Sequence, residues 1–447
     1  MPRASKKTPV VAPKPDDPSE LPDSIGNVPE DSEHVRIARG GSVEEGAAAK
    51  EPVKRGRGRP KKEPAEVTEE EDPLAFLMHR FPGRVMEGNK YTMPWVLRRL
   101  PTGLASLDIA LGGGLPAGVF SMFIGQPSCG KNMLAGCVIA RQQDIWKDEL
   151  RVAVCTTEGV WDKTQARFQG IQVAYSEEEI EAMSRARARA GRPFNAAELA
   201  DLRHQVGRFF VTQQGLPSDV MLEMALEFVR SRKFHVVLID SFGAMLSEDD
   251  LVKALTDNDR VSGPAGLQSR FATRVMQALG PDKDGRPNMT CVIGINQVRD
   301  NIDRSNPNSP KTKEPGAWAL KHARGLCIEL ARKGWQNAEK GSRERVGKDV
   351  GWSIVKQKAG GHEGASGDFL YSMTRGPDFA RDVLETAVDL GVISRSGNTY
   401  MDGNALIGPR TNCGMTAAAA WLEEDREYMQ QLYDRCLEAA GIFCEYR

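Results

Sequence analysis

The chain of 447 residues contains no apolar run that approaches the roughly 20 residues a membrane-spanning helix needs. Its eight cysteines are scattered and never form a C-x-x-C pair, which argues against a zinc ribbon and against a disulfide scaffold. No apolar secretory core follows the basic N-terminus, so we expect an intracellular, cytoplasmic protein. The formal net charge of −1 gives no whole-chain reason to bind nucleic acid, so any such binding must be local.

Phe, Trp and Tyr are absent from residues 1–72, which are rich in Pro, Glu, Ser, Gly and Lys. A segment of this composition buries too little apolar surface to offset the entropy of ordering it, so we expect a disordered arm. Its basic run at residues 54–62 resembles an AT-hook, in which Arg57 and Arg59 of the R-G-R-P core would enter the minor groove of duplex DNA. A solvated basic patch explains the same residues, and both interpretations stay open.

A short helix is predicted directly after this arm. Asp72 suits an N-cap and Pro73 the first helical position, and Phe76, Leu77 and Phe81 then recur at roughly helical spacing. Such an apolar face must pack on something, either the chain's own core or a neighbouring subunit. We interpret residues 73–98 as an oligomerisation helix and a linker.

The remainder of the chain alternates apolar runs with helical patterns. Predicted strands cover residues 119–124, 151–157, 209–213, 234–240 and 290–297, and predicted helices cover 133–143 and 219–231. Residues 176–208 are charged and Ala-rich and predict a helical hairpin broken at residues 191–193. This alternation is typical of an α/β fold with a mainly parallel sheet flanked by helices.

The first strand leads into a G-x-x-x-x-G-K sequence that opens a predicted helix. Glycines at these positions let backbone N–H groups curl around a phosphate, while the lysine and the helix N-terminus add positive charge. The motif usually continues with Ser or Thr, whose hydroxyl contacts Mg²⁺, but this chain has Asn there. The expected nucleotide-binding residues are Gly125, Gln126, Pro127, Ser128, Cys129, Gly130, Lys131, Asn132 and Met133.

Three further strands end in polar residues, at the edge where open α/β sheets bind ligands. Asp240 ends an otherwise apolar strand and is expected to hold Mg²⁺, directly or through water. Glu158 could orient and deprotonate an attacking water, and Gln297 could sense a γ-phosphate. Strands often end in polar residues, but this order after a phosphate loop argues against coincidence.

These motifs together resemble the RecA recombinase family, in one of its phage-like or otherwise divergent members. The resemblance covers LPTGLASLDIALGGGLPAG, the phosphate loop, TTEGVWD, LIDSFGAM, INQVRDNI, PGAWALKHARG, SIVKQKAGG and YMDGNALIG, in family order. It implies a RecA-like P-loop ATPase core over residues 99–381 and a small C-terminal α/β domain over residues 382–447. ATP and Mg²⁺ are the implied cofactors.

The resemblance also implies roles for single residues. Glu158 would be the catalytic carboxylate, Asp240 the Walker B aspartate, and Gln297 the residue that couples nucleotide state to DNA binding. Asp162 would lie near the adenine. The family's adenine-stacking tyrosine falls on Gln165 here, so the resemblance does not supply base stacking.

In this family ATP binds between adjacent subunits of a helical filament, and two lysines reach across the interface. Lys356 and Lys358 occupy that K-x-K pattern and would complete the catalytic set with Lys131. The neighbouring subunit would supply the positive charge that neutralises the γ-phosphate, so this neutralisation would depend on assembly. Arginine fingers act in the same way. Without the resemblance, a solvated strand edge would explain both lysines.

Two polar loops, at residues 246–266 and 299–316, would carry single-stranded DNA. Neither loop contains an aromatic residue, so we expect contacts to the phosphate backbone rather than base stacking. By resemblance, a helix after the first loop adds one more arginine. The expected DNA-binding residues here are Arg270, Arg299, Arg304, Lys311 and Lys313.

The expected function is an ATP-dependent recombinase that coats single-stranded DNA, samples duplex DNA and exchanges strands, associated with nucleoid or phage DNA. An Asn amide oxygen can ligate Mg²⁺, but its different reach predicts that Asn132, assisted by Met133, slows hydrolysis more than binding. The alternative is a nucleotide-binding accessory relative that regulates another recombinase. A hexameric helicase, or a related repair factor with a zinc finger, fits less well because the cysteine quartet is missing.

Overall fold

The computed structural model describes residues 73–81, 88, 92–157, 162–213, 215–245, 263–300, 312–314, 316–338, 342–373 and 375–443. The chain divides into two compact units, Met1–Val67 and Thr68–Arg447, and the described residues belong to the second. Five predicted site residues lie outside them, namely Arg57, Arg59, Glu158, Arg304 and Lys311. No helix among the described residues is long and apolar enough to cross a membrane.

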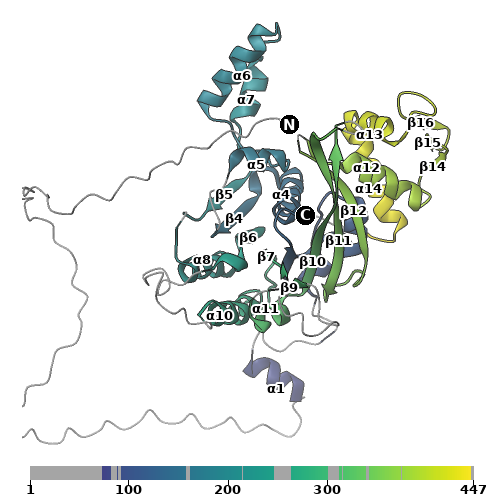
Figure 1. The fold of residues 1–447 in the computed structure, drawn as a ribbon. Helices are drawn as coiled ribbons and strands as arrows, with labels where there is room; N and C mark the ends of the chain where they lie inside the picture. The colour runs from purple at the N-terminus through teal and green to yellow at the C-terminus, as the bar shows by residue number, and fades with distance from the viewer. Residues whose placement is uncertain are drawn as a thin grey trace, which may run out of the picture. The chain divides into compact units, whose positions relative to one another are not determined.

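A nine-stranded sheet forms the centre of the fold, in the order β13-β12-β11-β10-β3-β7-β6-β4-β5 (Figure 1). The six strands from β10 to β5 are parallel, and β11, β12 and β13 add an antiparallel edge. The prediction of a mainly parallel sheet is therefore confirmed. The strands are β3 (Phe120–Gly125), β4 (Arg151–Thr156), β5 (Arg208–Val211), β6 (Val236–Asp240), β7 (Cys291–Gln297), β10 (Leu326–Asn337), β11 (Arg345–Gln357), β12 (Ser366–Ser372) and β13 (Gly376–Pro377).

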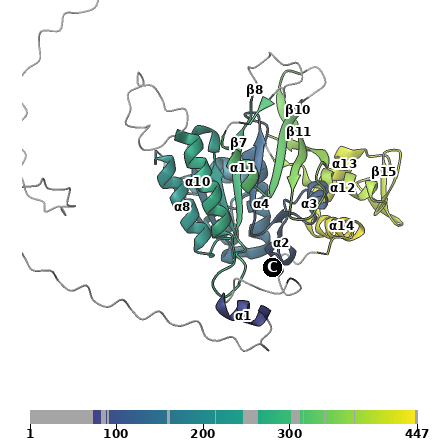
Figure 2. The same cartoon turned by 90° about the horizontal axis from the view of Figure 1, so that it is seen from below.

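Helices cover both faces of this sheet, as a buried parallel sheet requires. In β3, Phe120 and Met122 pack into one apolar cluster and Phe123 into another, which is the alternation expected of a strand between two cores. Figure 2 shows α8 and α10 side by side over one of these faces. One face is covered by α4 (Lys131–Trp146) and α5 (Lys163–Phe168), and the other by α8 (Ser218–Arg230), α10 (Gly263–Ala278) and α11 (Trp318–Ala323).

The predicted helical hairpin is confirmed as α6 (Glu177–Arg189) and α7 (Ala196–Arg203), which project from the rest of the core (Figure 1). Both helices begin with a capping box, formed by Ser176 with Glu179 and by Asn195 with Glu198. In each box, the side chain of the first residue accepts from the backbone N–H of the glutamate. The glutamate side chain in turn accepts from the backbone N–H of the first residue. Local sequence signals therefore determine where this insertion begins and turns.

The predicted N-terminal helix is also present, as α1 (Pro73–Arg80), with Leu77 and Phe81 about 40% exposed. The short helix α2 (Pro94–Leu97) follows, and α3 (Ala105–Leu111) precedes the central strand. Two small ladders pair β1 (Arg99–Leu100) with β2 (Leu115–Pro116), and β8 (Arg299–Asp300) with β9 (Thr312–Lys313).

The first predicted DNA loop, residues 246–266, extends too far along the chain. The helix α10 already begins at Gly263. The two glycines and the proline of residues 263–266 suggested a loop. These residues instead form the first turn of a helix that is anchored by Leu267 and Phe271 in the apolar core.

The C-terminal part has its own apolar cluster, which also includes Ala105 from α3. A three-stranded antiparallel sheet and three helices build it, as the predicted small α/β domain requires, while the domain boundary at residue 382 stays a prediction. Its elements are α12 (Phe379–Asp389), β14 (Ser394–Ser396), β15 (Thr399–Asp402), β16 (Ala405–Ile407), α13 (Met415–Glu424) and α14 (Arg426–Ala439).

Two buried carboxylates lie where this C-terminal part meets α3. Asp108 accepts hydrogen bonds from the backbone N–H of Thr102 at 2.9 Å and from the Tyr433 hydroxyl at 2.8 Å. Asp382 accepts from the Ser106 hydroxyl at 2.5 Å and from the Ser106 N–H at 3.2 Å. Burial raises the pKa of Asp108 to about 6 and that of Asp382 to about 7.

We predict that replacing Asp382 with Asn reduces the pH dependence of stability. Between the ordinary pKa of 3.8 and the folded pKa of about 7, the folded chain retains a proton that the unfolded chain has lost. This contribution therefore falls as the pH rises through that window, by at most about 1.4 kcal/mol per pH unit. Thermal unfolding at pH 5 and pH 8 should show D382N gaining stability relative to wild type at the higher pH.

Asp389→Asn is the matched control, because Asp389 is exposed on the same helix. An equal response of D382N and D389N to pH would contradict the role of the buried carboxylate.

Candidate nucleotide site

The phosphate loop connects the end of β3 to the start of α4, as the sequence predicts. Gly125 has φ 153°, and a Cβ atom there would collide with the Leu330 carbonyl and the Cys129 sulfur. Gly130, at the N-cap of α4, has φ 118°, and Ser128 has φ 59°. Glycine tolerates these angles, whereas Ser128 holds a left-handed conformation that is unfavourable for a residue with a Cβ. The loop is therefore tightly curved, and its shape depends on support from its surroundings.

Lys131 is buried inside the curve of this loop. Its ammonium group donates to the carbonyl oxygens of Gly125 at 3.0 Å and Gln126 at 2.8 Å. The Cys129 sulfur lies 3.8 Å from the same nitrogen, and burial raises the pKa of this thiol. The loop thus presents a positive charge and a helix N-terminus at one place, which is the arrangement that binds phosphate.

Asn132 and Asp240 meet at the edge of the sheet beside the loop. The Asn132 amide nitrogen donates to Asp240 Oδ2 at 2.5 Å, joining the first turn of α4 to the end of β6. An amide oxygen and a carboxylate are both hard oxygen donors that suit Mg²⁺. The described residues contain no group of three or more His, Cys, Asp or Glu side chains that could hold a metal alone. A Mg²⁺ ion here would therefore need oxygens from water or from a bound phosphate as well.

A cavity of about 180 Å³ extends from this pair towards α5. Asn132, Asp240, Asp162 and Gln165 all contribute to its lining. Asp162 is the N-cap of α5 and accepts from the Thr164 N–H at 2.8 Å, so the carboxylate is also a structural cap. Glu158 follows the end of β4 but lies outside the described residues, so its predicted catalytic role stays a prediction.

Gln297 lies next to the loop because β3 and β7 pair in parallel, with Gly125 opposite Gln297. Its backbone N–H donates to the Asn296 side-chain oxygen at 3.0 Å. The Asn296 amide nitrogen in turn lies 3.4 Å from Glu314, and Glu314 forms a buried ion pair with Arg324 at 2.7 Å. These contacts join the nucleotide edge to Glu314, which directly follows β9, and the sequence pattern gave no sign of them.

Lys356 and Lys358 lie at the opposite end of the sheet from the phosphate loop. Lys356 pairs with Cys327, and Cys327 with Met122, whereas the loop begins at Gly125. The Lys356 ammonium points to α11, where it donates to the carbonyls of Lys321 at 2.5 Å and His322 at 3.3 Å. Burial and the nearby Lys358 lower the pKa of Lys356. The two lysines therefore cannot serve the loop of their own subunit.

The predicted DNA-binding residues fall into three groups. Arg270 is exposed on α10, as predicted. Arg299 and Lys313, predicted within an irregular loop, instead pair with each other in the β8–β9 ladder. Arg304 and Lys311 lie between these strands in the chain, outside the described residues.

Comparison with known proteins connects this geometry to one family. The family model for the RecA N-terminal domain matches residues 196–374, a stretch that begins after the phosphate loop. Protein RecA of Aquifex pyrophilus is 27% identical over 347 residues, covering 77% of this chain and 83% of its own length. Protein RecA of Thermus thermophilus is 28% identical over 344 residues, covering 76% and 85%.

These matches support a divergent member of the RecA family. Protein RecA of Ruminococcus albus, 29% identical over 331 residues, covers 73% of the chain and 70% of its own length. A crystal structure of the RadB recombinase covers 62% of this chain and 98% of its own at 20% identity, with a TM-score of 0.36, and adds nothing to the assignment.

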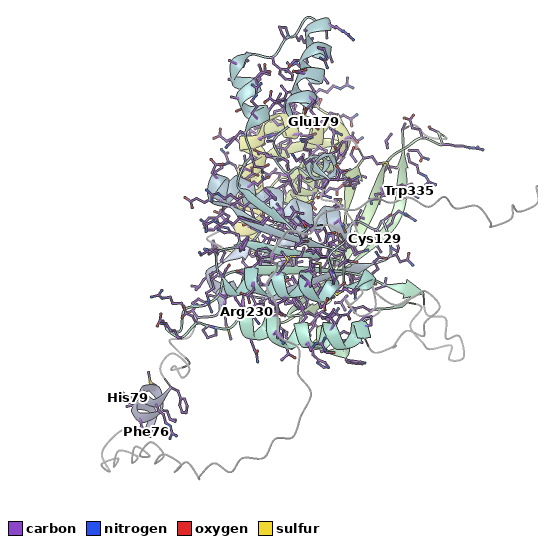
Figure 3. The ribbon with its side chains drawn as sticks, turned by 90° about the vertical axis from the view of Figure 1, so that its left-hand side faces the viewer. Phe76, His79, Cys129, Glu179, Arg230 and Trp335 are labelled. Carbon is purple, nitrogen blue, oxygen red and sulfur yellow. The ribbon has the colours of Figure 1, made fainter. Side chains whose placement is uncertain are left out.

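The sequence interpretation missed a basic hairpin in this chain. β10 pairs with β3 only through Leu330, so its later residues extend beyond β3 and pair with β11, which also pairs with β12. Trp335 lies on this part of β10 (Figure 3). The guanidinium groups of Arg332 and Arg345 lie 4.7 and 4.3 Å from the Trp335 ring centre. Both arginines are exposed. The run A-R-K-G-W followed by S-R-E-R-V was the available signal.

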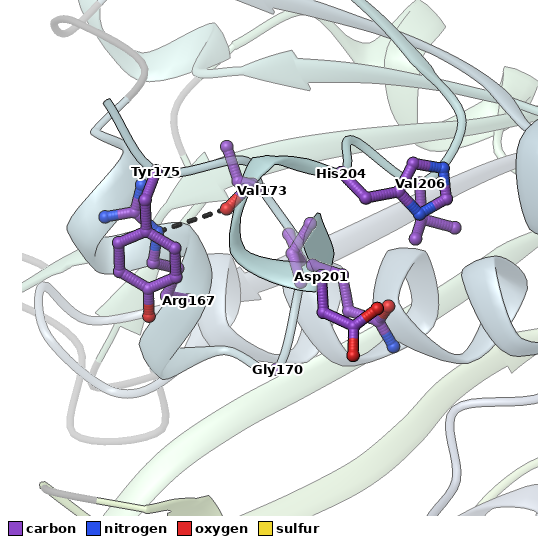
Figure 4. Close-up of a pocket in the computed structure, with 9 residues that line it drawn as sticks. Arg167, Gly170, Val173, Tyr175, Asp201, His204 and Val206 are labelled. Atoms are coloured by element: carbon purple, nitrogen blue, oxygen red, sulfur yellow. Dashed lines mark hydrogen bonds between the residues drawn. The ribbon is translucent and has the colours of Figure 1, made fainter. Parts of the chain in front are cut away.

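Another cavity, of about 540 Å³, lies away from the loop, between the end of α5 and α7 (Figure 4). Arg167 donates to the Val173 carbonyl at 3.3 Å, lies over the Tyr175 ring and pairs with Glu179. These polar groups satisfy one another and hold the helical hairpin on the core. We therefore assign this cavity a structural role and the phosphate loop the chemical one.

We predict that Asn132→Thr raises ATP turnover by about tenfold. The threonine hydroxyl would replace an amide that reaches further and that donates to Asp240. Steady-state phosphate release with single-stranded DNA measures this change. Asn132→Ala is the control, since it removes the amide without adding a hydroxyl and should lower turnover. Equal turnover of N132T and wild type would show that Asn132 does not limit hydrolysis.

Proposed function

We propose that this RecA-family chain is an ATP-dependent DNA recombination and repair protein that forms a helical filament on single-stranded DNA and exchanges strands. The single observation that carries the filament is the separation of Lys131 from Lys356 and Lys358. The phosphate loop lies at one end of the sheet and the K-x-K pair at the other. A head-to-tail contact between copies brings these two ends together, and such a contact extends into a filament when it does not close.

The residues present suit ATP with Mg²⁺. Backbone N–H groups of the loop and Lys131 would bind the β- and γ-phosphates, while Asn132 and Asp240 would hold the cation. Bound Mg²⁺ would supply the Lewis acidity that neutralises charge on the phosphates. Glu158 would hold the attacking water, and Gln297 would respond to the γ-phosphate. Its neighbour Asn296 would transmit that response to Glu314.

DNA binding is proposed at three places on the same chain. The segments that follow β6 and β8, together with Arg270, would contact the phosphates of a single strand. The basic hairpin adds exposed guanidinium groups and a tryptophan, a combination that suits a nucleic-acid backbone and unpaired bases. The AT-hook-like run with Arg57 and Arg59 would assist capture of duplex DNA.

We predict that the double variant Lys356→Ala, Lys358→Ala loses DNA-stimulated ATP turnover by at least about 1,000-fold, the lower end of the range for charges supplied by a neighbouring subunit. Binding of ADP to the isolated subunit should stay within about twofold of wild type, because both lysines lie far from the loop. Phosphate release and ADP titration measure the two effects. Lys283→Ala, an exposed lysine between α10 and β7, is the matched control.

A loss of ADP affinity in the double variant as large as its loss of turnover would contradict the separation of these sites.

The function itself is tested by ATP turnover with and without single-stranded DNA, measured beside electron microscopy and a strand-exchange assay. Stimulation by DNA, helical filaments and exchanged strands support the recombinase. Nucleotide and DNA binding without strand exchange would instead support an accessory relative that regulates another recombinase, which Asn132 and Met133 favour. Closed rings would contradict both and indicate a hexameric motor.

A further inference from the structure

A second lysine contacts the phosphate loop from outside. Lys348, near the start of β11, donates its ammonium to the Ser128 carbonyl at 2.9 Å. The two residues are 220 positions apart in the chain. This lysine belongs to the same subunit as the loop, and it lies at the end of β11 opposite to Lys356.

The Lys348 side chain is held in place on several sides. Its backbone is paired with Trp335 of β10 and Tyr371 of β12, and its ammonium lies 5.2 Å from the Tyr371 ring centre. Partial burial, assisted by the nearby Arg332 and Lys131, lowers the pKa of Lys348. An ordered and partly desolvated ammonium makes a stronger contact with a carbonyl than a freely moving surface lysine does.

The next residue on the same face of β11 also supports the loop. Val350 is fully buried, and a Cβ atom added at Gly130 would lie 3.4 Å from its side chain. Lys348 and Val350 thus contact Ser128 and Gly130, the two loop residues with positive φ between Gly125 and Lys131. β11 therefore supports the most strained part of the loop.

The planarity of the peptide bond explains what Lys348 does to this loop. The Ser128 carbonyl and the Cys129 N–H belong to one trans peptide, so they point in opposite directions. The carbonyl points out to Lys348, and the N–H points in, towards the Gln126 carbonyl at 3.4 Å. That carbonyl also accepts from Lys131. Holding the carbonyl outside therefore keeps the N–H on the phosphate-binding side.

We propose that Lys348 is a positioning residue for nucleotide phosphate: it fixes the Ser128 carbonyl on the outer side of the loop and adds a second positive charge to the one from Lys131. The inference rests on the proposed nucleotide site and assigns one of its supports. Lys131 acts inside the curve and Lys348 outside it. The ligand that depends on both is the diphosphate part of a nucleotide.

The test is titration of the full-length protein with a fluorescent ADP analogue and Mg²⁺, with thermal unfolding recorded for every variant. Lys348→Met keeps the aliphatic stem against Tyr371 but loses the charge and the donor, and should weaken binding about tenfold. Lys348→Arg keeps both and should remain within about threefold of wild type. Lys283→Met, an exposed lysine between α10 and β7, is the control and should bind as wild type does.

Equal affinity of K348M and wild type would overturn the inference. Equal losses in K348M and K348R, with unchanged unfolding temperatures, would also overturn it, because shape rather than the donated hydrogen bond would then matter. Failure of the wild-type protein itself to bind ADP would overturn the nucleotide site, and with it the proposed function, whatever the variants do.

Discussion

The parallel pairing of β3 with β7 on one side and β10 on the other is the constraint on which the candidate site depends. It places Gly125 opposite Gln297 and beside Leu330, so that β3 and β7 end at one edge while β10 continues past it. The same register makes Gly125 necessary, because the Leu330 carbonyl leaves no space for a side chain there. The phosphate loop and Gln297 are close together for this reason, although they are far apart in the sequence.

The antiparallel strand β11 carries both Lys348, beside the phosphate loop, and Lys356, near its other end. Because it runs back along β10, it begins beside the phosphate loop with Lys348 and ends at the far side of the sheet with Lys356. One strand of 13 residues therefore begins beside the phosphate loop of its own subunit and ends next to Lys356, which is proposed to serve another subunit.

Local sequence patterns predicted much of this architecture. Alternating apolar runs gave the central strands, the charged and Ala-rich pattern with its break at residues 191–193 gave the α6–α7 hairpin, and glycine spacing gave the loop from Gly125 to Lys131. Contacts between distant residues could not be predicted in this way. Lys348 reads as one more surface lysine until the register of β10 and β11 is known, and Asp108 looks like an ordinary helix residue until Tyr433 covers it. The start of α10 was missed because its first turn is stabilised by tertiary packing rather than by composition.

The central claim is that each nucleotide site is completed by the next subunit. Its most direct test mixes two inactive variants, Lys131→Met and the double variant Lys356→Ala, Lys358→Ala, on single-stranded DNA and measures ATP turnover. Each variant lacks one half of the site, and a mixed filament contains interfaces in which an intact loop faces intact lysines. The account predicts that the mixture regains turnover that neither variant shows alone. Co-assembly of the two variants without any recovered turnover would contradict it.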